Sequence, residues 1–274
     1  MELPIYIKRE HVGTKNVRDN VAHYHNNIEL IYVLKGNMDC QTNNSIFSLE
    51  EGDLCFINRN QIHHLYEKTR ISEHISVIID TSLLTKYSDI TNKYIEPMIN
   101  DVSFSHVKFK SLDSNSEHIY KLILDIEKLI KEKKETYELS VISDIHLIFK
   151  YLYLTYINCD KEEIYDYDKF LCQKMIKYIE DNYQNDIKTL DLQNYIHISR
   201  TKCFKIFKKY TRLSPNIYIN NYRIKKASEK LIETNDSIID IALSSGFNDA
   251  SYFNKLFLKE FNMRPKEFRY KYQK

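Results

Sequence analysis

Three histidines and one glutamate in the N-terminal half have the residue types of a ligand set. His23, His25 and Glu29 lie close together in the chain, and His63 follows on a later segment. If residues 21–33 form one strand, side-chain alternation puts the first three on one face, where His63 on a neighbouring strand could join them. Imidazole nitrogens combined with a carboxylate suit a divalent metal such as Zn, Fe, Mn or Ni.

The same four side chains also suit two other roles. They could surround a small organic molecule with hydrogen bonds, or they could form a polar patch that satisfies its own hydrogen-bonding groups. The residue types alone do not separate these alternatives. We therefore treat them as a predicted effector site, with a divalent metal as one alternative and no ligand as another.

Short strands are predicted around this set. Apolar, β-branched runs occupy residues 28–34, 46–49, 54–57 and 75–79, and turn residues such as Gly36 and Gly52 separate them. Several short strands at this spacing indicate a small β-barrel or sandwich.

Two helices are predicted to follow, over residues 119–130 and 139–157. The first has apolar residues at the i, i+3, i+4, i+7 positions of one face. Such a helix pair can cap the barrel or join two copies of the chain. We predict a dimer interface on the apolar stripe of the first helix, formed by Ile119, Leu122, Ile123, Ile126 and Ile130.

Charge divides the chain into two parts. Residues 169–274 carry 21 Lys and Arg against 11 Asp and Glu, whereas residues 1–168 carry 19 against 27. A basic part joined to an acidic one is typical of a nucleic-acid-binding module attached to another domain. The length of 274 residues also favours more than one domain.

The remaining composition indicates a cytoplasmic protein. The N-terminus lacks the apolar core of a signal peptide, and no stretch of eighteen apolar residues occurs, so no membrane association is expected. The five scattered cysteines form no CxxC pair and are expected to be reduced.

Residues 238–257 have the pattern of a helix-turn-helix. Ala242 allows close helix approach, Gly246 permits a turn with positive φ, and Asn248 or Asp249 can cap the next helix. That helix has an apolar face, and its polar side chains are left for the major groove of DNA.

Residues 192–208 form a second candidate of the same kind, earlier in the chain. Ser199 is placed to cap a helix whose inner face is Cys203, Ile206 and Phe207. Cationic side chains around the rest of this helix favour phosphate and base contacts, although a solvated helix face has the same pattern.

At residues 225–269 the sequence resembles the C-terminal signature of AraC/XylS-type transcription regulators. The matching features include Ala227, Leu231, Ile241-Ala242, Gly246-Phe247, Asp249, Ser251-Tyr252-Phe253, Phe257-Leu258-Lys259, Phe261, Pro265 and Phe268-Arg269. The resemblance covers residues 170–274 and implies two helix-turn-helix units that enter successive major-groove segments. The DNA-binding residues it implies, together with their exposed neighbours, are Arg200, Thr201, Lys202, Lys205, Lys208, Ser251, Tyr252, Asn254 and Lys255.

The sequence departs from the family pattern at four positions. Gln193 replaces a small residue and Arg212 replaces a glycine, which leaves the geometry of the first unit open. Phe204 stands where the family often has a polar residue, and it either contacts a thymine methyl or packs internally. Asn262 replaces a glycine after the second recognition helix, a mild change because asparagine tolerates the left-handed conformation.

The N-terminal half is similar to the cupin barrel found in many of these regulators. Residues 23–36 match the first cupin motif in spacing, and residues 52–63 follow the second, with Asn58 and Asn60 in place of Pro and Gly. The resemblance predicts a multidomain α+β protein: a cupin-like effector-binding barrel (1–110), a helical dimerisation segment (111–158), a linker (159–168) and an all-α DNA-binding domain (169–274).

These observations predict a sequence-specific transcription regulator, an activator by family habit, controlled by a small molecule in the barrel. The partners expected are double-stranded DNA, the effector, RNA polymerase and a second copy of the chain. No resident cofactor is expected, apart from the divalent metal of the alternative reading. No enzyme is expected, although cupin barrels also occur in dioxygenases and isomerases, because the chain shows no Gly-rich phosphate loop, GxSxG or HExxH.

Overall fold

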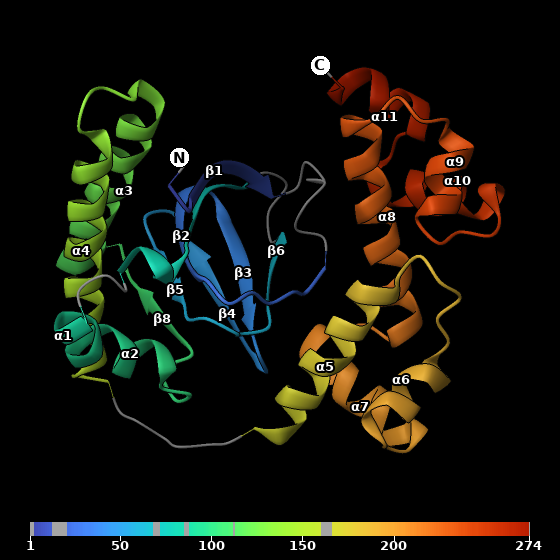
Figure 1. Ribbon diagram of the computed structural model, residues 1–274, viewed down its shortest axis with the longest axis horizontal. Helices are drawn as coiled ribbons and strands as arrows, with labels where there is room; N and C mark the ends of the chain where they lie inside the picture. Colours follow the sequence, from blue (N-terminus) through green and yellow to red (C-terminus); the bar gives the residue numbers. More distant parts are fainter. Residues whose placement is uncertain are drawn as a thin grey trace. The chain divides into compact units, whose positions relative to one another are not determined.

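A computed structural model describes residues 3–12, 21–67, 72–84, 88–111, 113–159 and 166–273. The chain forms two compact units, one of residues 1–14 with 24–165 and the other of residues 15–23 with 166–274 (Figure 1). Most of the predicted linker, residues 160–165, lies outside the described residues. No helix among the described residues is long and apolar enough to cross a membrane.

The described residues of the first unit form two antiparallel sheets. The larger has the order β1 (Ile5–Val12), β7 (Ser72–Ile79), β2 (Ile28–Lys35), β5 (Leu54–Ile57) and β8 (His106–Phe109). The smaller has the order β4 (Ser45–Glu50), β3 (Asn37–Thr42) and β6 (His63–Glu67). The predicted β-rich N-terminal fold is confirmed, and β1, β3, β6 and β8 are strands that the apolar runs did not reveal.

Strand β2 shows how one sheet serves two cores. Ile28 and Leu30 belong to the cluster between the larger sheet and the helices, whereas Ile31 and Val33 belong to a second cluster with residues of the smaller sheet. Side chains alternate between the faces of a strand, so both clusters are built from one continuous apolar run. Glu29 shares the face of Ile31 and therefore points between the sheets.

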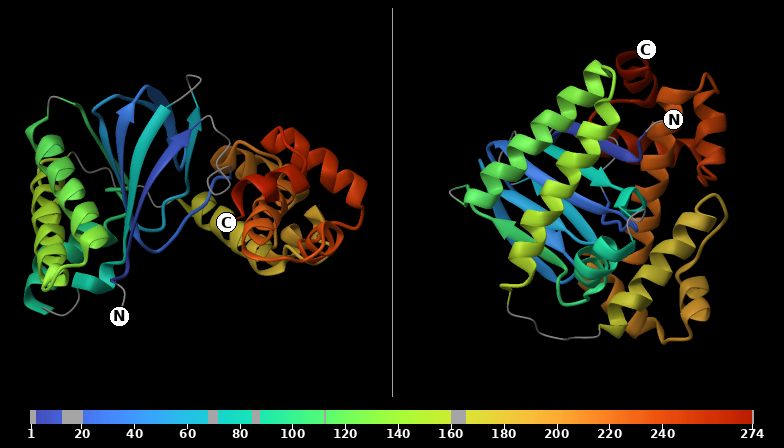
Figure 2. Two further views of the ribbon diagram at one scale, coloured as in Figure 1. Left: turned by 90° about the horizontal axis from the view of Figure 1, so that it is seen from above. Right: turned by 60° about the vertical axis from the view of Figure 1, so that its left-hand side comes forward.

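Helices α3 (Ser114–Glu132) and α4 (Tyr137–Tyr156) cover the outer face of the larger sheet (Figure 2). Ile119, Ile123 and Ile126 are completely buried in this core, and Leu122 and Ile130 pack against it. The predicted dimer interface is therefore wrong for Ile119, Ile123 and Ile126, whereas Leu122 and Ile130 pack against the core but are only partly buried. The amphipathic pattern predicts a helix, which is confirmed, but the centre of its apolar face is covered within the same chain.

Between β7 and β8 the described residues, 80–84 and 88–105, form four short helical segments that the sequence did not indicate. They are η1 (Thr81–Leu84), α1 (Ser88–Ile90), the π-helical η2 (Thr91–Ile95) and α2 (Glu96–Asn100). Met98 and Ile99 join the core beneath α4. The segments are too short for a hydrophobic periodicity to be recognised.

The second unit is helical. Its first part contains α5 (Tyr167–Asn182), α6 (Thr189–Ile196) and α7 (Arg200–Thr211), and α8 (Pro215–Glu233) connects it to α9 (Ile238–Ser244), α10 (Ala250–Phe261) and α11 (Pro265–Tyr272). Phenylalanines dominate the core formed by α8, α9, α10 and α11, where Phe253, Phe257 and Phe268 are completely buried. The all-α C-terminal fold expected from the sequence is confirmed.

Candidate nucleic-acid interface and effector site

The second helix-turn-helix consists of α9, the turn at Gly246 and α10. Gly246 has a φ of +88°, which L side chains rarely adopt. A Cβ atom added there would lie 2.3 Å from the Tyr183 carbonyl oxygen and 2.8 Å from Nε of Arg223. Gly246 therefore serves two purposes, the turn itself and the close approach of Tyr183 at the end of α5 and of Arg223 in α8, and only the first was evident from the sequence.

Helix α10 begins at an aspartate cap and presents a polar face. The Asp249 carboxylate accepts hydrogen bonds from the Ser251 and Tyr252 backbone N–H groups, at 2.7 and 3.3 Å. Of the two proposed caps, Asp249 is thus the one used. The side chains assigned to DNA contact, Ser251, Tyr252, Asn254 and Lys255, are all exposed.

The first helix-turn-helix consists of α6 and α7 and has the same construction. Ser199 caps α7 by accepting from the Lys202 backbone N–H at 3.3 Å. The inner face is buried as predicted, and Cys203 contacts Met175 of α5. The side chains assigned to DNA contact on this helix are exposed: Arg200, Thr201, Lys202, Lys205 and Lys208.

The departures from the family pattern are accommodated without glycine. Arg212 and Asn262 end α7 and α10 in the left-handed conformation, with φ of 60° and 51°. His197 adopts φ of 53° in the first turn, where the second unit has Gly246. Phe204 is half-buried and lies beneath the Arg200 guanidinium, 5.7 Å from ring centroid to Cζ.

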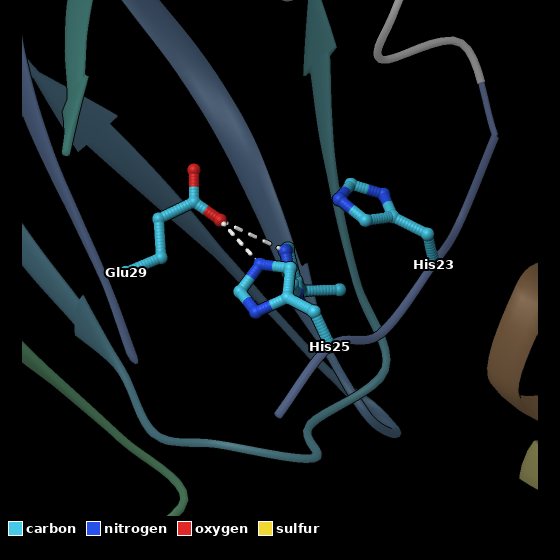
Figure 3. A group of neighbouring side chains, drawn as sticks. His23, His25 and Glu29 are labelled. Carbon is cyan, nitrogen blue, oxygen red and sulfur yellow. Dashed lines mark hydrogen bonds and ion pairs between the residues drawn. The ribbon is translucent and has the colours of Figure 1, made fainter. Parts of the chain in front are cut away.

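The four predicted ligand residues meet in the structure. Their ligand atoms all lie within 4.8 Å of one another, and Figure 3 shows three of the residues, His23, His25 and Glu29. The expected single strand over residues 21–33 is wrong, because β2 begins only at Ile28 and His25 lies before it, outside any strand. The loop, rather than strand alternation, turns His25 toward Glu29.

The Glu29 carboxylate is the centre of the group. It is 6 % exposed and lies 3.3 Å from Nε2 of His25 and 3.0 Å from Nε2 of His63. The Ser76 hydroxyl of β7 donates to its other oxygen. Sequence reasoning missed Ser76, although a serine within an apolar strand indicates a polar group on the inner side of the sheet.

The electrostatics of the group favour a negative carboxylate. Burial by itself raises the pKa of Glu29, but the hydrogen bonds from His25 and His63 outweigh it and hold that pKa well below its usual range. Burial lowers the pKa of His63, yet the bond to Glu29 prevails and the pKa is raised. The pair thus favours a carboxylate facing an imidazolium.

The hydrogen bonds of the two Nδ1 atoms, those of His25 and His63, determine whether the Nε2 atoms can bind a metal. Nδ1 of His63 lies 2.8 Å from the Gln61 carbonyl oxygen, and Nδ1 of His25 lies 3.0 Å from that of Asn27. Since a carbonyl only accepts, both Nδ1 atoms carry hydrogen, and in a neutral ring Nε2 presents a lone pair to the carboxylate. Either a proton or a cation must lie between each Nε2 atom and the Glu29 carboxylate, because both carry lone pairs. The donor set therefore fits a divalent metal.

Comparisons with known proteins agree with both halves of this description. Residues 192–271 match the helix-turn-helix domain family and residues 15–70 match the cupin domain family. The uncharacterized HTH-type transcriptional regulator YdeC of Bacillus subtilis is 24% identical over 97% of this chain and 91% of its own. The HTH-type transcriptional activator RhaS of Enterobacter sp. is 23% identical over 90% of this chain and 86% of its own.

The fold is shared with solved structures. ToxT of Vibrio cholerae, bound to (E)-4-(8-methylnaphthalen-1-yl)but-3-enoic acid, aligns with a TM-score of 0.54 at 15% identity, over 97% of this chain and 98% of its own. ToxT bound to an unsaturated fatty acid aligns with a TM-score of 0.51 at 14% identity, over 97% and 95%. These structures have the same order of a β-rich domain and a helical domain.

A cupin-type barrel joined to paired helix-turn-helix units defines a DNA-binding transcription regulator. The relatives are named as transcription regulators and are matched over most of their length, and the protein is accordingly a regulator and not an enzyme. Both parts of the chain are similar to AraC/XylS-type transcription regulators.

Proposed function

We propose that a small molecule bound in the barrel at His23, His25, Glu29 and His63 controls DNA binding by the helical unit. The observation that carries this proposal is the buried Glu29 carboxylate, which faces two imidazoles in the interior between the sheets. Burying a charge with polar partners is costly, and ligand recognition is a reason to retain such a group. The group suits a small polar molecule with hydroxyl or amino groups, which would replace the imidazoles as partners of Glu29.

The chain itself supplies a route from this group to the DNA-binding helices. Val21 and Ala22 lie in the segment 15–23, which belongs to the same compact unit as the DNA-binding helices, and both are buried. The Ala22 carbonyl accepts from the Tyr218 hydroxyl of α8 at 2.7 Å, and the Tyr218 ring packs edge-on against Phe207 of α7. A ligand that moves His25 therefore acts three residues from a contact with α8, whose Tyr218 in turn packs against the first recognition helix.

A thermal-shift screen of sugars, peptides, lipids and metals tests this proposal. The expected result is stabilisation by one ligand class in the parent protein and its loss in Glu29→Gln, which keeps the shape but removes the charge. A matched control is Glu117→Gln, since Glu117 lies exposed on α3. If no ligand stabilises the parent, control by abundance or by a protein partner is favoured instead.

A divalent metal is the second candidate occupant, favoured by the orientation of the Nδ1 atoms. His25, Glu29 and His63 would hold the ion through two Nε2 atoms and one carboxylate oxygen, with His23 as a fourth ligand. Ligand atoms around zinc at 2.0–2.2 Å lie about 3.3 Å apart, close to the separations found here. Such an ion would supply a fixed positive charge that orders the site.

Metal content after purification without a chelator tests this alternative. The expected result is close to one equivalent in the parent and a large loss in His63→Ala. Less than about a tenth of an equivalent in the parent would rule the metal out, since structural sites of this kind bind tightly.

We further propose that the regulator is a cytoplasmic dimer that activates transcription together with RNA polymerase. The RhaS relative is described as an activator, and two copies reading adjacent half-sites would multiply modest affinities. The burial of α3 moves the interface we propose to exposed apolar side chains of α4, Leu147 and Leu154, and to Ile157 directly after it. Sedimentation of Leu147→Ser beside the parent tests this, and a monomeric parent at micromolar concentration with and without DNA would contradict it.

A further inference from the structure

A polar cleft of about 380 Å³ lies within the helical unit. Its polar lining comprises Lys188, Thr189, Asn216, Asn220, Arg223 and Tyr252. Two of these side chains are cationic and none is acidic. Two acidic side chains lie near Lys188 outside this lining. The carboxylate of the exposed Asp186 lies 3.7 Å from Nζ, and that of Asp191 accepts from the Lys188 backbone N–H at 2.7 Å. The lining itself is cationic and polar, which is the character of an anion site.

The cleft lies between the two DNA-reading parts. Lys188 and Thr189 stand at the start of α6, in the first helix-turn-helix, and Tyr252 stands at the start of α10, in the second. The floor comes from α8, which connects them. Successive major-groove segments on one face of DNA are separated by a minor groove with a sugar-phosphate chain on either side. Protein surface between two recognition helices must therefore face these phosphates.

The orientation of Tyr252 agrees with this placement. Its hydroxyl accepts a hydrogen bond from Nδ2 of Asn220 at 3.1 Å, so the side chain leans toward α8 and the cleft. A tyrosine in this position presents its hydroxyl to the cleft rather than to base edges. The family resemblance implied that Tyr252 is a DNA-binding residue.

Arg223 supplies a positive charge that is held in place by uncharged groups. Its Nε donates to the Tyr183 carbonyl at 2.8 Å and its Nη2 to the Asn185 carbonyl at 2.7 Å. Carbonyl oxygens orient the guanidinium without neutralising its charge. This arrangement leaves a fixed cation beside the cleft.

We propose that this cleft binds a backbone phosphate of DNA between the two major-groove segments read by α7 and α10. This proposal rests on the DNA-binding function, and it adds that the cleft contacts the DNA backbone. Lys188 contributes charge, and the Tyr252 hydroxyl and the Asn220 amide contribute hydrogen bonds. The Thr189 hydroxyl instead donates to Oδ1 of Asn216 at 2.9 Å and orients that side chain at the edge of the cleft. A contact of this kind fixes the register of the protein on DNA without reading sequence.

The test measures affinity against salt concentration for the full chain. The probes are a duplex of about 30 base pairs carrying a site selected from random sequence, and one of mixed sequence, both long enough for two major-groove segments. Lys188→Ala is expected to weaken binding to both duplexes by the same factor and to reduce the slope of log K against log salt by about 0.9. Tyr252→Phe is expected to weaken both equally.

Two comparisons keep the outcome interpretable. Lys121→Ala removes the same charge from an exposed lysine of the barrel unit, and it should leave the slope unchanged. Urea unfolding should show that each variant is as stable as the parent. A slope for Lys188→Ala equal to that of Lys121→Ala, or a Tyr252→Phe loss confined to the selected site, would overturn the proposal. A parent that binds neither duplex would instead refute DNA binding itself.

Discussion

Replacement of Gly246 by alanine should destabilise the helical unit strongly. Two separate costs apply. A side chain at φ of +88° costs about 1–2 kcal/mol in backbone strain. The new Cβ would also lie 2.3 Å from the Tyr183 carbonyl oxygen, and relief of such overpacking costs typically about 1–3 kcal/mol. We therefore expect a loss of about 2–5 kcal/mol in the free energy of unfolding.

Gly246→Asn separates the two costs. Asparagine tolerates the left-handed region, so it should recover much of the backbone strain, but it carries the same Cβ. We expect Gly246→Asn to remain well below the parent in stability, and only about 1 kcal/mol above Gly246→Ala. Urea unfolding followed by far-UV circular dichroism measures both, with the barrel unit as an internal reference.

Two results would refute this reasoning. If Gly246→Asn is as stable as the parent, the close approach to Tyr183 carries no cost and only the turn requires glycine. If Gly246→Ala lies within about 0.5 kcal/mol of the parent, as for an ordinary surface substitution, neither cost is real. Full stability with unchanged DNA affinity would also show that the second helix-turn-helix is not held against the end of α5 through this contact.

Three further predictions concern other parts of the chain. Lys255→Ala should cost about 1–3 kcal/mol in binding to a selected site, with little loss on mixed sequence, if it reads a base; equal losses on both duplexes would reassign it to the backbone. Ile123→Ala should lower the stability of the barrel unit by about 2–5 kcal/mol, measured by urea unfolding, and should leave the oligomeric state unchanged, because Ile123 is completely buried in its own subunit. Asp166→Asn should destabilise the helical unit at neutral pH. Burial raises the pKa of Asp166, but its bonds to Tyr210 and the Lys169 N–H and the nearby Lys209 lower it overall. Its stabilisation is therefore present above the unfolded pKa of about 3.9 and is lost as the pH falls through the folded value, so the difference from the parent should shrink in acid.

Local signals carried most of what could be predicted in the helical unit. The caps at Ser199 and Asp249, the turn at Gly246 and the apolar spacing of α10 each depend on residues within a few positions of one another. Backbone hydrogen bonding and helix periodicity act over the same distance. For this reason the helices of this unit, and the exposure of their DNA-facing side chains, could be predicted from the sequence.

The barrel was less predictable because its strands are irregular in composition. β3, with the sequence NMDCQT, has no apolar run, yet its Met38 and Cys40 are completely buried. β1 is separated by about sixty residues from β7, its partner. Pairing over such distances leaves no local mark in the sequence.

The sequence by itself determined the class of protein, the two helix-turn-helix units and the residue types of the effector site. Only the tertiary structure decided which surfaces remain free: α3 is covered by its own sheet, Tyr252 turns toward α8, and His25 and His63 converge on Glu29. The physical reason is that a periodic pattern shows that a face is apolar or polar, whereas its partner is chosen by segments far away in the chain. Local chemistry therefore identified the parts, and long-range packing assigned their contacts.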